Sequence, residues 1–365
     1  MSRFQRRRSR VRAAIRRKRL DALLVTNETN VHYLTGFTGD SSYLLLSSDD
    51  EIICSDSRYT TQLERECPQI ERLIQTQKTD MNATVARALR KLDVAQVGVE
   101  ADSLSVAAHQ RLADAVKQAE FLPTSGIVEK LREIKDAQEI RLLREAIRQA
   151  EQAFTALRAT LAGHETERQI AAELEYLVRR CGGDGFSFEP VIAAGPNAAL
   201  PHARASDARI VGATHLLIDW GANHRRYKSD LTRVLLTSRI PSKLKRIYGV
   251  VSAAQAAAID AIEPGVPASQ VDRAARSVID DAGFGRYFGH GLGHGIGLDI
   301  HEGPRINSRN DEPLKPGMVI TVEPGIYLPG YGGIRIEDDV LVTRTGHDVL
   351  SSLPKQLEEM TVFAN

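Results

Sequence analysis

A glycine-rich segment, residues 290–302, restricts how this chain can fold more than any other feature. It reads HGLGHGIGLDIHE, so that His290, His294 and His301 are separated by glycines at alternate positions. Because glycine has no side chain, the backbone can lie close to whatever these imidazoles contact. Clustered imidazoles usually serve metal ions or proton transfer. The segment therefore predicts a site at which histidine side chains converge.

Four carboxylates flank this segment at the ends of apolar runs. They are Asp219 after LLI, Asp230 before LTRVLL, Glu323 after ITV, and Glu337 within IRIEDD. Taken singly, each is typical of a turn or of a solvated strand edge. Together with one imidazole they could hold two divalent ions, which would neutralise the repulsion among four converging acids. The set predicts a metal-dependent hydrolase.

Length and composition indicate a two-domain globular protein of 365 residues. The net charge of +1 gives no reason to expect nucleic acid or a membrane as a partner, and no apolar run is long enough to span a bilayer. Cys54, Cys67 and Cys181 have neither disulfide nor zinc-site spacing. This cysteine usage favours a cytoplasmic location.

The N-terminal segment is strongly basic. Residues 3–19 carry ten Lys or Arg side chains and no acid. We expect a solvated first helix with Phe4, Val11, Ile15 and Leu20 as its apolar stripe, because most charge runs are solvated faces. An organelle-targeting segment or a polyanion-binding arm is the alternative.

The pattern of apolar runs and turn signals predicts a strand-helix-strand domain over residues 1–126. A second domain over residues 127–365 is expected to begin with a helix capped by Asp136 and Glu139. A further helix is predicted over 166–181 and a helical pair over 242–262 and 268–282. Strands are predicted at 216–219, 234–237, 318–322 and 334–343. This order favours an α+β fold for the second domain.

Taken together, the motifs resemble those of the Xaa-Pro peptidases, aminopeptidase P and prolidase, of the pita-bread metallopeptidase family. The resemblance also includes NVHYLTGFTG at 30–39, DSRY at 56–59 and LREIK at 131–135. It implies a pita-bread catalytic domain preceded by a smaller α/β domain of the creatinase type, and a homodimer. Creatinase itself lacks the metal-binding acids, and methionine aminopeptidases usually lack such an N-terminal domain.

The resemblance assigns metal ligands residue by residue. It implies that Asp219 binds one ion, that Asp230 and Glu337 bridge two ions, and that His294 and Glu323 complete the second site. Manganese is the usual metal of the family, with cobalt or zinc as substitutes.

The resemblance also assigns proton transfer and substrate contacts. Glu323 is the expected acid/base for a hydroxide that bridges the two metals. His290 and His301 match substrate-facing positions that orient the substrate and shuttle protons. His202 matches another proton-shuttling position, although alone it is typical of a loop histidine. Three arginines are further substrate-side candidates. Arg305 and Arg309 could capture a substrate carboxylate or could be solvated, and Arg335 is expected to orient the metal-site acids.

The expected activity is hydrolysis of the bond between an N-terminal residue and a following proline, as in an Xaa-Pro aminopeptidase. The alternative is an Xaa-Pro dipeptidase, which must also capture the carboxylate of proline. A more remote alternative is an inactive binding protein on the same fold, but all the expected ligands are present. The expected partners are peptides with proline at the second position.

Overall fold

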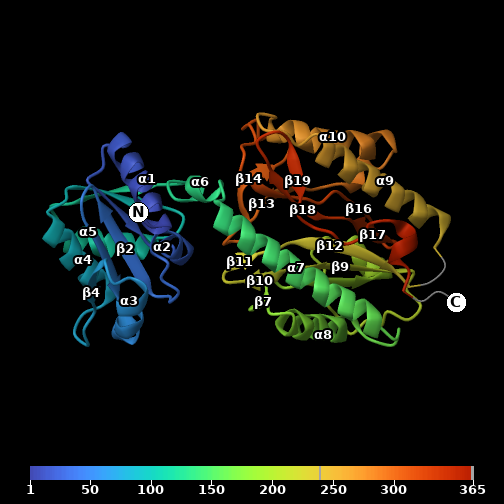
Figure 1. Ribbon diagram of the computed structural model, residues 1–365, viewed down its shortest axis with the longest axis horizontal. Coiled ribbons are helices and arrows are strands. Elements are labelled where there is room, and N and C mark those ends of the chain that lie inside the picture. Colours follow the sequence, from blue (N-terminus) through green and yellow to red (C-terminus); the bar gives the residue numbers. More distant parts are fainter. Residues whose placement is uncertain (238–239, 363–365) are drawn as a thin grey trace. The chain divides into compact units, whose positions relative to one another are not determined.

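The computed structural model describes residues 1–237 and 240–362, and the chain forms two compact units, Met1–Arg132 and Glu133–Asn365 (Figure 1). The units divide after helix α6 (Glu129–Arg132), whereas the boundary predicted from the sequence lies ahead of this helix, at Gly126. Helix α6 lies with the first unit because the Tyr33 hydroxyl donates to the Leu131 carbonyl and Arg132 donates to Asn30. Within the described ranges, no helix is long and apolar enough to cross a membrane.

The first unit contains a mixed six-stranded sheet in the order β4-β3-β2-β1-β5-β6. Its strands are β1 (Ala22–Val25), β2 (Ser42–Ser47), β3 (Glu51–Ser55), β4 (Glu71–Ile74), β5 (Gln96–Glu100) and β6 (Glu120–Thr124). Its other helices are α1 (Arg3–Arg17), α2 (Glu28–Thr35), α3 (Thr60–Glu66), α4 (Met81–Leu92) and α5 (Val106–Ala115). Central strands such as β1 are buried along their whole length, which explains their continuous apolar runs.

Helix α1 departs from the expectation of a wholly solvated basic face. Val11 and Ile15 are buried as predicted, but Arg7 and Arg8 are buried as well. Arg8 pairs with Glu51 at 2.7 Å and donates to the Leu34 carbonyl, and the Arg7 guanidinium lies over the Tyr33 ring. These contacts are made with distant residues, so the charge run alone could not reveal them.

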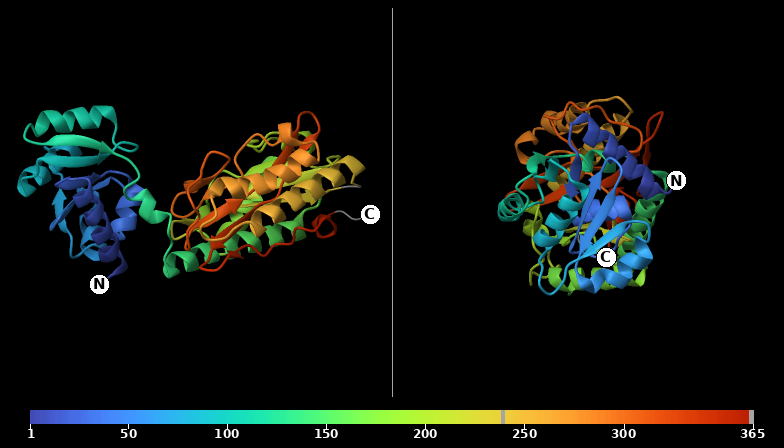
Figure 2. Two further views of the ribbon diagram at one scale, coloured as in Figure 1. Left: turned by 90° about the horizontal axis from the view of Figure 1, so that it is seen from above. Right: turned by 90° about the vertical axis from the view of Figure 1, so that its left-hand side faces the viewer.

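Four long helices enclose the strands of the second unit. They are α7 (Ala137–Thr160), α8 (Glu167–Arg180), α9 (Ser242–Asp260) and α10 (Ala268–Asp281). Asp136 and Thr166 each begin a helix with a capping box, as the sequence predicts for Asp136. Within this unit α7 and α8 lie on one side of the strands and α9 and α10 on the other, with α9 and α10 side by side (Figures 1 and 2).

The strands of the second unit pair in an antiparallel manner. They form one five-stranded sheet, β14-β13-β15-β18-β19, two three-stranded sheets, β12-β9-β8 and β11-β10-β7, and the hairpin β16-β17. Their bounds are β7 (Gly185–Phe186), β8 (Val191–Ala194), β9 (His215–Trp220), β10 (Ala222–His224), β11 (Tyr227–Lys228), β12 (Leu231–Leu236), β13 (Gly293–Gly295), β14 (Glu302–Ile306), β15 (Val319–Val322), β16 (Gly325–Leu328), β17 (Gly332–Arg335), β18 (Asp338–Val342) and β19 (His347–Val349).

One strand that the sequence predicts as continuous is interrupted in the structure. The sequence predicts a single strand over 334–343, but the structure divides it into β17 and β18. The residues between them turn toward β12, where the Glu337 N–H donates to the Thr232 carbonyl. The break places the Glu337 carboxylate between two sheets, which no local periodicity could indicate.

Trp220 anchors β9, the strand that also carries Asp219, in the core of the second unit. Its ring stacks on Phe154 of α7 with the centroids 4.5 Å apart, and its indole N–H donates to the Ala150 carbonyl. Because neighbouring side chains of a strand point to opposite faces, burying Trp220 against α7 directs Asp219 to the other face of β9.

Candidate metal centre

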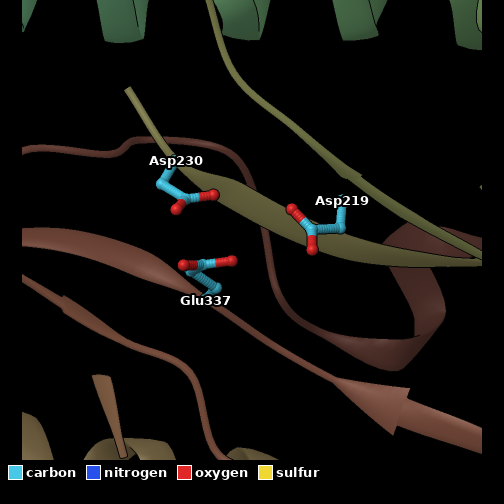
Figure 3. A group of neighbouring side chains, drawn as sticks. All are labelled: Asp219, Asp230 and Glu337. Carbon is cyan, nitrogen blue, oxygen red and sulfur yellow. The ribbon is translucent and has the colours of Figure 1, made fainter. Parts of the chain in front are cut away.

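Asp219, Asp230 and Glu337 form the centre of the site. One carboxylate oxygen from each lies within 4.8 Å of the others, and the three groups point toward one another (Figure 3). Asp219 lies in β9, Asp230 directly precedes β12, and Glu337 lies between β17 and β18. Thr232 of β12 pairs with both Asp219 and Glu337, so backbone pairing itself sets the spacing of these acids.

His294 and Glu323 complete the group. The His294 Nε2 atom lies 3.6 Å from Asp230 Oδ2 and 3.4 Å from Glu323 Oε1. His294 belongs to the short strand β13, and glycines on either side of it allow the neighbouring strands to approach. A Cβ atom at Gly293 would lie 2.1 Å from the Thr321 carbonyl oxygen, and one at Gly295 would lie 2.0 Å from that of Gly303. The glycines of the histidine segment are therefore required by close backbone packing.

Burial dominates the electrostatics of the carboxylates. Burial raises the pKa of Asp219, and burial together with the charge of neighbouring acids raises the pKa values of Asp230 and Glu337 well above their ordinary range. Burial likewise raises the pKa of Glu323 to about 7. The Asp219 Oδ1 atom is buried and makes no hydrogen bond. Converging acids of this kind have strong affinity for cations.

Arg335 is the protein's own cation at the site. Its side chain is 3% exposed, and it pairs with Asp219 and donates to the Tyr327 hydroxyl at 2.8 Å and to Thr232 Oγ1 at 3.1 Å. Arg335 therefore holds one carboxylate and two hydroxyl groups in fixed positions. Arg335 is the residue expected from the sequence to orient the metal-site acids, and Asp219 is the acid that it contacts.

Several groups that hold the candidate ligands were not predicted from the sequence. Thr232 Oγ1 donates to Glu337 Oε2 at 2.6 Å, and Thr321 Oγ1 donates to Glu323 Oε1 at 3.2 Å. The buried Asp339 accepts the backbone N–H of Asp230 at 3.1 Å. Only the position of the two threonines in the sequence could have indicated their role, since both lie on strands that carry or adjoin predicted ligands.

The remaining candidate histidines, His202, His290 and His301, line the same cavity of about 1010 Å³ as the acids. The His301 ring lies 4.4 Å from the His294 ring, and His290 Nε2 lies 3.0 Å from the Tyr327 hydroxyl. Burial lowers the pKa of His290 to about 4 and that of His294 to about 3, so both rings are neutral at pH 7. His202 reaches the cavity from the loop that follows β8.

The three candidate arginines differ in whether they line the cavity. Arg305 and Arg335 line the cavity. Arg309 lies in the loop after β14 and is exposed outside that lining, where its backbone N–H donates to the Asn307 side chain. Arg168 and Arg204 also line the cavity and had no sequence signal, because they lie at exposed positions without a motif.

Comparison with known proteins identifies the family of both units. The model of metallopeptidase family M24 matches residues 141–344, and that of the creatinase/prolidase N-terminal domain matches residues 7–134. The chain is 34% identical to the Xaa-Pro dipeptidase of Pyrococcus horikoshii over 339 residues, 93% of this chain and 94% of that one.

Two solved structures extend the comparison. The Xaa-Pro dipeptidase from Bacillus anthracis has a TM-score of 0.94 at 37% identity, covering 97% of this chain and 99% of that one. The X-Pro aminopeptidase from Thermotoga maritima has a TM-score of 0.86 at 36% identity, covering 93% and 99%. The predicted architecture, a creatinase-type N-terminal domain followed by a pita-bread domain, is confirmed. The chain therefore belongs to metallopeptidase family M24 and is a two-domain metallo-exopeptidase.

Proposed function

We propose that this enzyme is an Xaa-Pro dipeptidase that uses two divalent metal ions. The observation that carries the proposal is the convergence of four carboxylates and His294 in one cavity that Arg305 also lines. The names of similar proteins support a dipeptidase more than the aminopeptidase expected first, since the relatives from Pyrococcus horikoshii and Pyrococcus furiosus are both called Xaa-Pro dipeptidases.

The donor set fits the implied metals. Asp219, Asp230, His294, Glu323 and Glu337 would hold two divalent ions. The chemistry is that of hard oxygen ligands with one imidazole, which suits manganese, the metal we propose, as well as cobalt or zinc. The unpartnered Oδ1 atom of Asp219 supports a ligand at this point.

Divalent ions at this site would supply Lewis acidity and lower the pKa of a shared water. The protein's own side chains would accept and donate the protons. Hydrolysis adds water across the peptide bond: the carbonyl carbon gains the hydroxyl group, the C–N bond breaks, and the proline nitrogen takes a proton. Glu323 is positioned by Thr321 to accept the proton of the water, and His202 is proposed to deliver one to the leaving nitrogen.

His290 and His301 are proposed to orient the substrate. His290 is neutral because burial lowers its pKa to about 4, and Tyr327 fixes the position of its Nε2 atom. The Nδ1–H group of His290 donates to the Gly291 carbonyl at 2.8 Å, so the Nε2 atom of the neutral ring is an acceptor, and the ring can pack beside the substrate without adding charge near the cluster. Arg305 is proposed to receive the carboxylate of proline, because a guanidinium binds a carboxylate through two parallel hydrogen bonds.

The second candidate is an Xaa-Pro aminopeptidase, favoured by the similarity to the Thermotoga maritima structure. Two assays separate the candidates: hydrolysis of Xaa-Pro dipeptides, and hydrolysis of Xaa-Pro tripeptides and longer peptides. We expect activity on dipeptides that chelation abolishes and Mn²⁺ restores. Preferential cleavage of the longer peptides would replace the dipeptidase proposal with the aminopeptidase.

Arg309 offers a matched control for Arg305, since both are exposed arginines near β14 and only Arg305 lines the cavity. Arg305→Ala is expected to raise KM for dipeptides about tenfold or more by removing a charge-assisted contact, and Arg309→Ala to leave it unchanged. Equal effects of both substitutions would refute the role of Arg305.

A homodimer and a cytoplasmic location complete the proposal. The three cysteines are unpaired, which supports a reducing compartment. The homodimer rests on the family resemblance alone and is tested by sedimentation or light scattering.

A further inference from the structure

We propose that Glu167, a buried carboxylate outside the metal centre, is a positioning residue for His202. The inference rests on the proposed function, in which His202 delivers a proton to the leaving nitrogen. Glu167 is the first residue of α8 and is 0% exposed. A carboxylate buried to this extent is costly unless its oxygens are hydrogen-bonded, so its contacts show what it holds.

The Glu167 carboxylate connects two distant points of one loop. Its Oε1 atom accepts the Ala194 N–H at 2.7 Å and the Asn197 side-chain amide at 2.9 Å. Its Oε2 atom accepts the Ser206 N–H at 3.0 Å and the Ser206 hydroxyl at 2.6 Å. Ala194 ends β8 and Ser206 lies beyond His202, so a single side chain contacts both ends of the segment 194–206, and the Arg168 N–H also donates to the Ser206 carbonyl at 3.0 Å.

The middle of the same segment is attached to the metal centre. Arg335, which pairs with Asp219, also donates to the Pro201 carbonyl at 3.3 Å. Pro201 directly precedes His202, and both residues line the cavity with Asp219. Glu167 at the ends and Arg335 at the middle thus set where the His202 ring lies relative to the acids.

A carboxylate is suited to this task because four donors face it. Each oxygen accepts two hydrogen bonds, and the position in the first turn of α8 favours a negative charge. In Glu167→Gln, one oxygen is replaced by an NH₂ group, which cannot accept from either pair of donors. One end of the loop would therefore lose its side-chain hydrogen bonds while the side-chain volume is kept, and only backbone hydrogen bonds would hold that end.

The test is a double-mutant cycle between Glu167 and His202, measured on an Xaa-Pro dipeptide. Glu167→Gln is expected to lower kcat about tenfold to a hundredfold, with a smaller change in KM, because a small displacement of a proton-transfer group acts on the chemical step. In a His202→Ala background the same substitution is expected to change kcat by less than about twofold, because the residue it positions is absent.

Two further variants separate positioning from general destabilisation. Val178→Ala, at a fully buried position on the same helix, should lower the melting temperature without changing kcat. Asn197→Ala removes one of the four donors and should reproduce a weaker form of the Glu167→Gln effect, so the inference stays testable if Glu167→Gln fails to fold.

Amide hydrogen exchange supplies a readout that needs no activity. Residues 195–206 should exchange faster in Glu167→Gln than in the wild type, and at the wild-type rate in Val178→Ala. Additive losses of kcat in the cycle, or unchanged exchange in this segment, would overturn the role of Glu167. A wild-type enzyme that cleaves no Xaa-Pro dipeptide would instead refute the proposed function, and the exchange measurement would still decide whether Glu167 holds the loop.

Discussion

Binding of Mn²⁺ to the metal-free protein should release protons, and the number released should fall as pH rises. Burial raises the pKa of Glu323 to about 7, and burial with neighbouring charge raises the pKa values of Asp230 and Glu337 well above their ordinary range. A group with a pKa of about 7 is roughly nine-tenths protonated at pH 6 and about one-hundredth protonated at pH 9. His294 contributes no proton, because burial lowers its pKa to about 3.

Ligands must lose these protons before they can bind a metal. Glu323 alone therefore predicts close to one proton released at pH 6, with further protons from Asp230 and Glu337. For each proton released, the apparent affinity for Mn²⁺ changes about tenfold per pH unit, which is about 1.4 kcal/mol in the free energy of binding. The apparent affinity for Mn²⁺ should thus rise steeply from pH 6 and level off as these acids ionise.

Isothermal titration calorimetry in two buffers of different ionisation enthalpy measures the proton count directly. Glu323→Gln is the internal control, and it should release about one proton fewer at pH 6. Release of fewer than about half a proton at pH 6, or the same release at pH 6 and pH 9, would refute the view that buried acids are held protonated until metal binds.

Measurements of stability and of affinity on three substitutions test parts of the site. Glu323→Gln should abolish hydrolysis yet stabilise the metal-free protein against urea by up to about 3 kcal/mol at pH 8. The reason is that the raised pKa of Glu323 gives a contribution to stability that is fully present below about pH 4.5 and is lost as pH rises through 7. The neutral glutamine does not lose this contribution. Equal free energies of unfolding for both proteins at pH 8 would contradict the reasoning. Gly293→Ala should weaken Mn²⁺ binding, measured by calorimetry, because its Cβ would lie 2.1 Å from the Thr321 carbonyl oxygen and displace His294; unchanged affinity would show that β13 tolerates a side chain. Arg335→Met should lower the free energy of unfolding of the metal-free protein by about 3–5 kcal/mol, because it leaves Asp219 unpaired, and by less after Mn²⁺ is added. An equal loss of stability in both states would mean that the metal does not replace the guanidinium.

The features that could be predicted from the sequence are those with a local physical signal. Asp136 forms the predicted capping box at the start of α7, and the helical pair α9 and α10 follows its apolar periodicity. The carboxylates of the candidate site adjoin apolar runs, which singly is typical of turns, and they could be named as a set only through the histidine segment and the family resemblance.

Other features depend on partners far away in the sequence. The break between β17 and β18 exists because Glu337 pairs with Thr232, and neither residue type nor periodicity shows this. Arg8 is buried because Glu51 and the Leu34 carbonyl receive its guanidinium. Glu167 looks like any solvated acid in the first turn of a helix until Ser206 and Ala194 are placed beside it.

Crystals soaked in MnCl₂ and measured at the manganese absorption edge would show directly whether acids and an imidazole from separate strands share a pair of cations. Two anomalous peaks about 3.5–4 Å apart, both touching the carboxylates of Asp230 and Glu337, are the predicted result. A peak at any other place, or density that leaves His294 and Glu323 without a cation, would contradict the account.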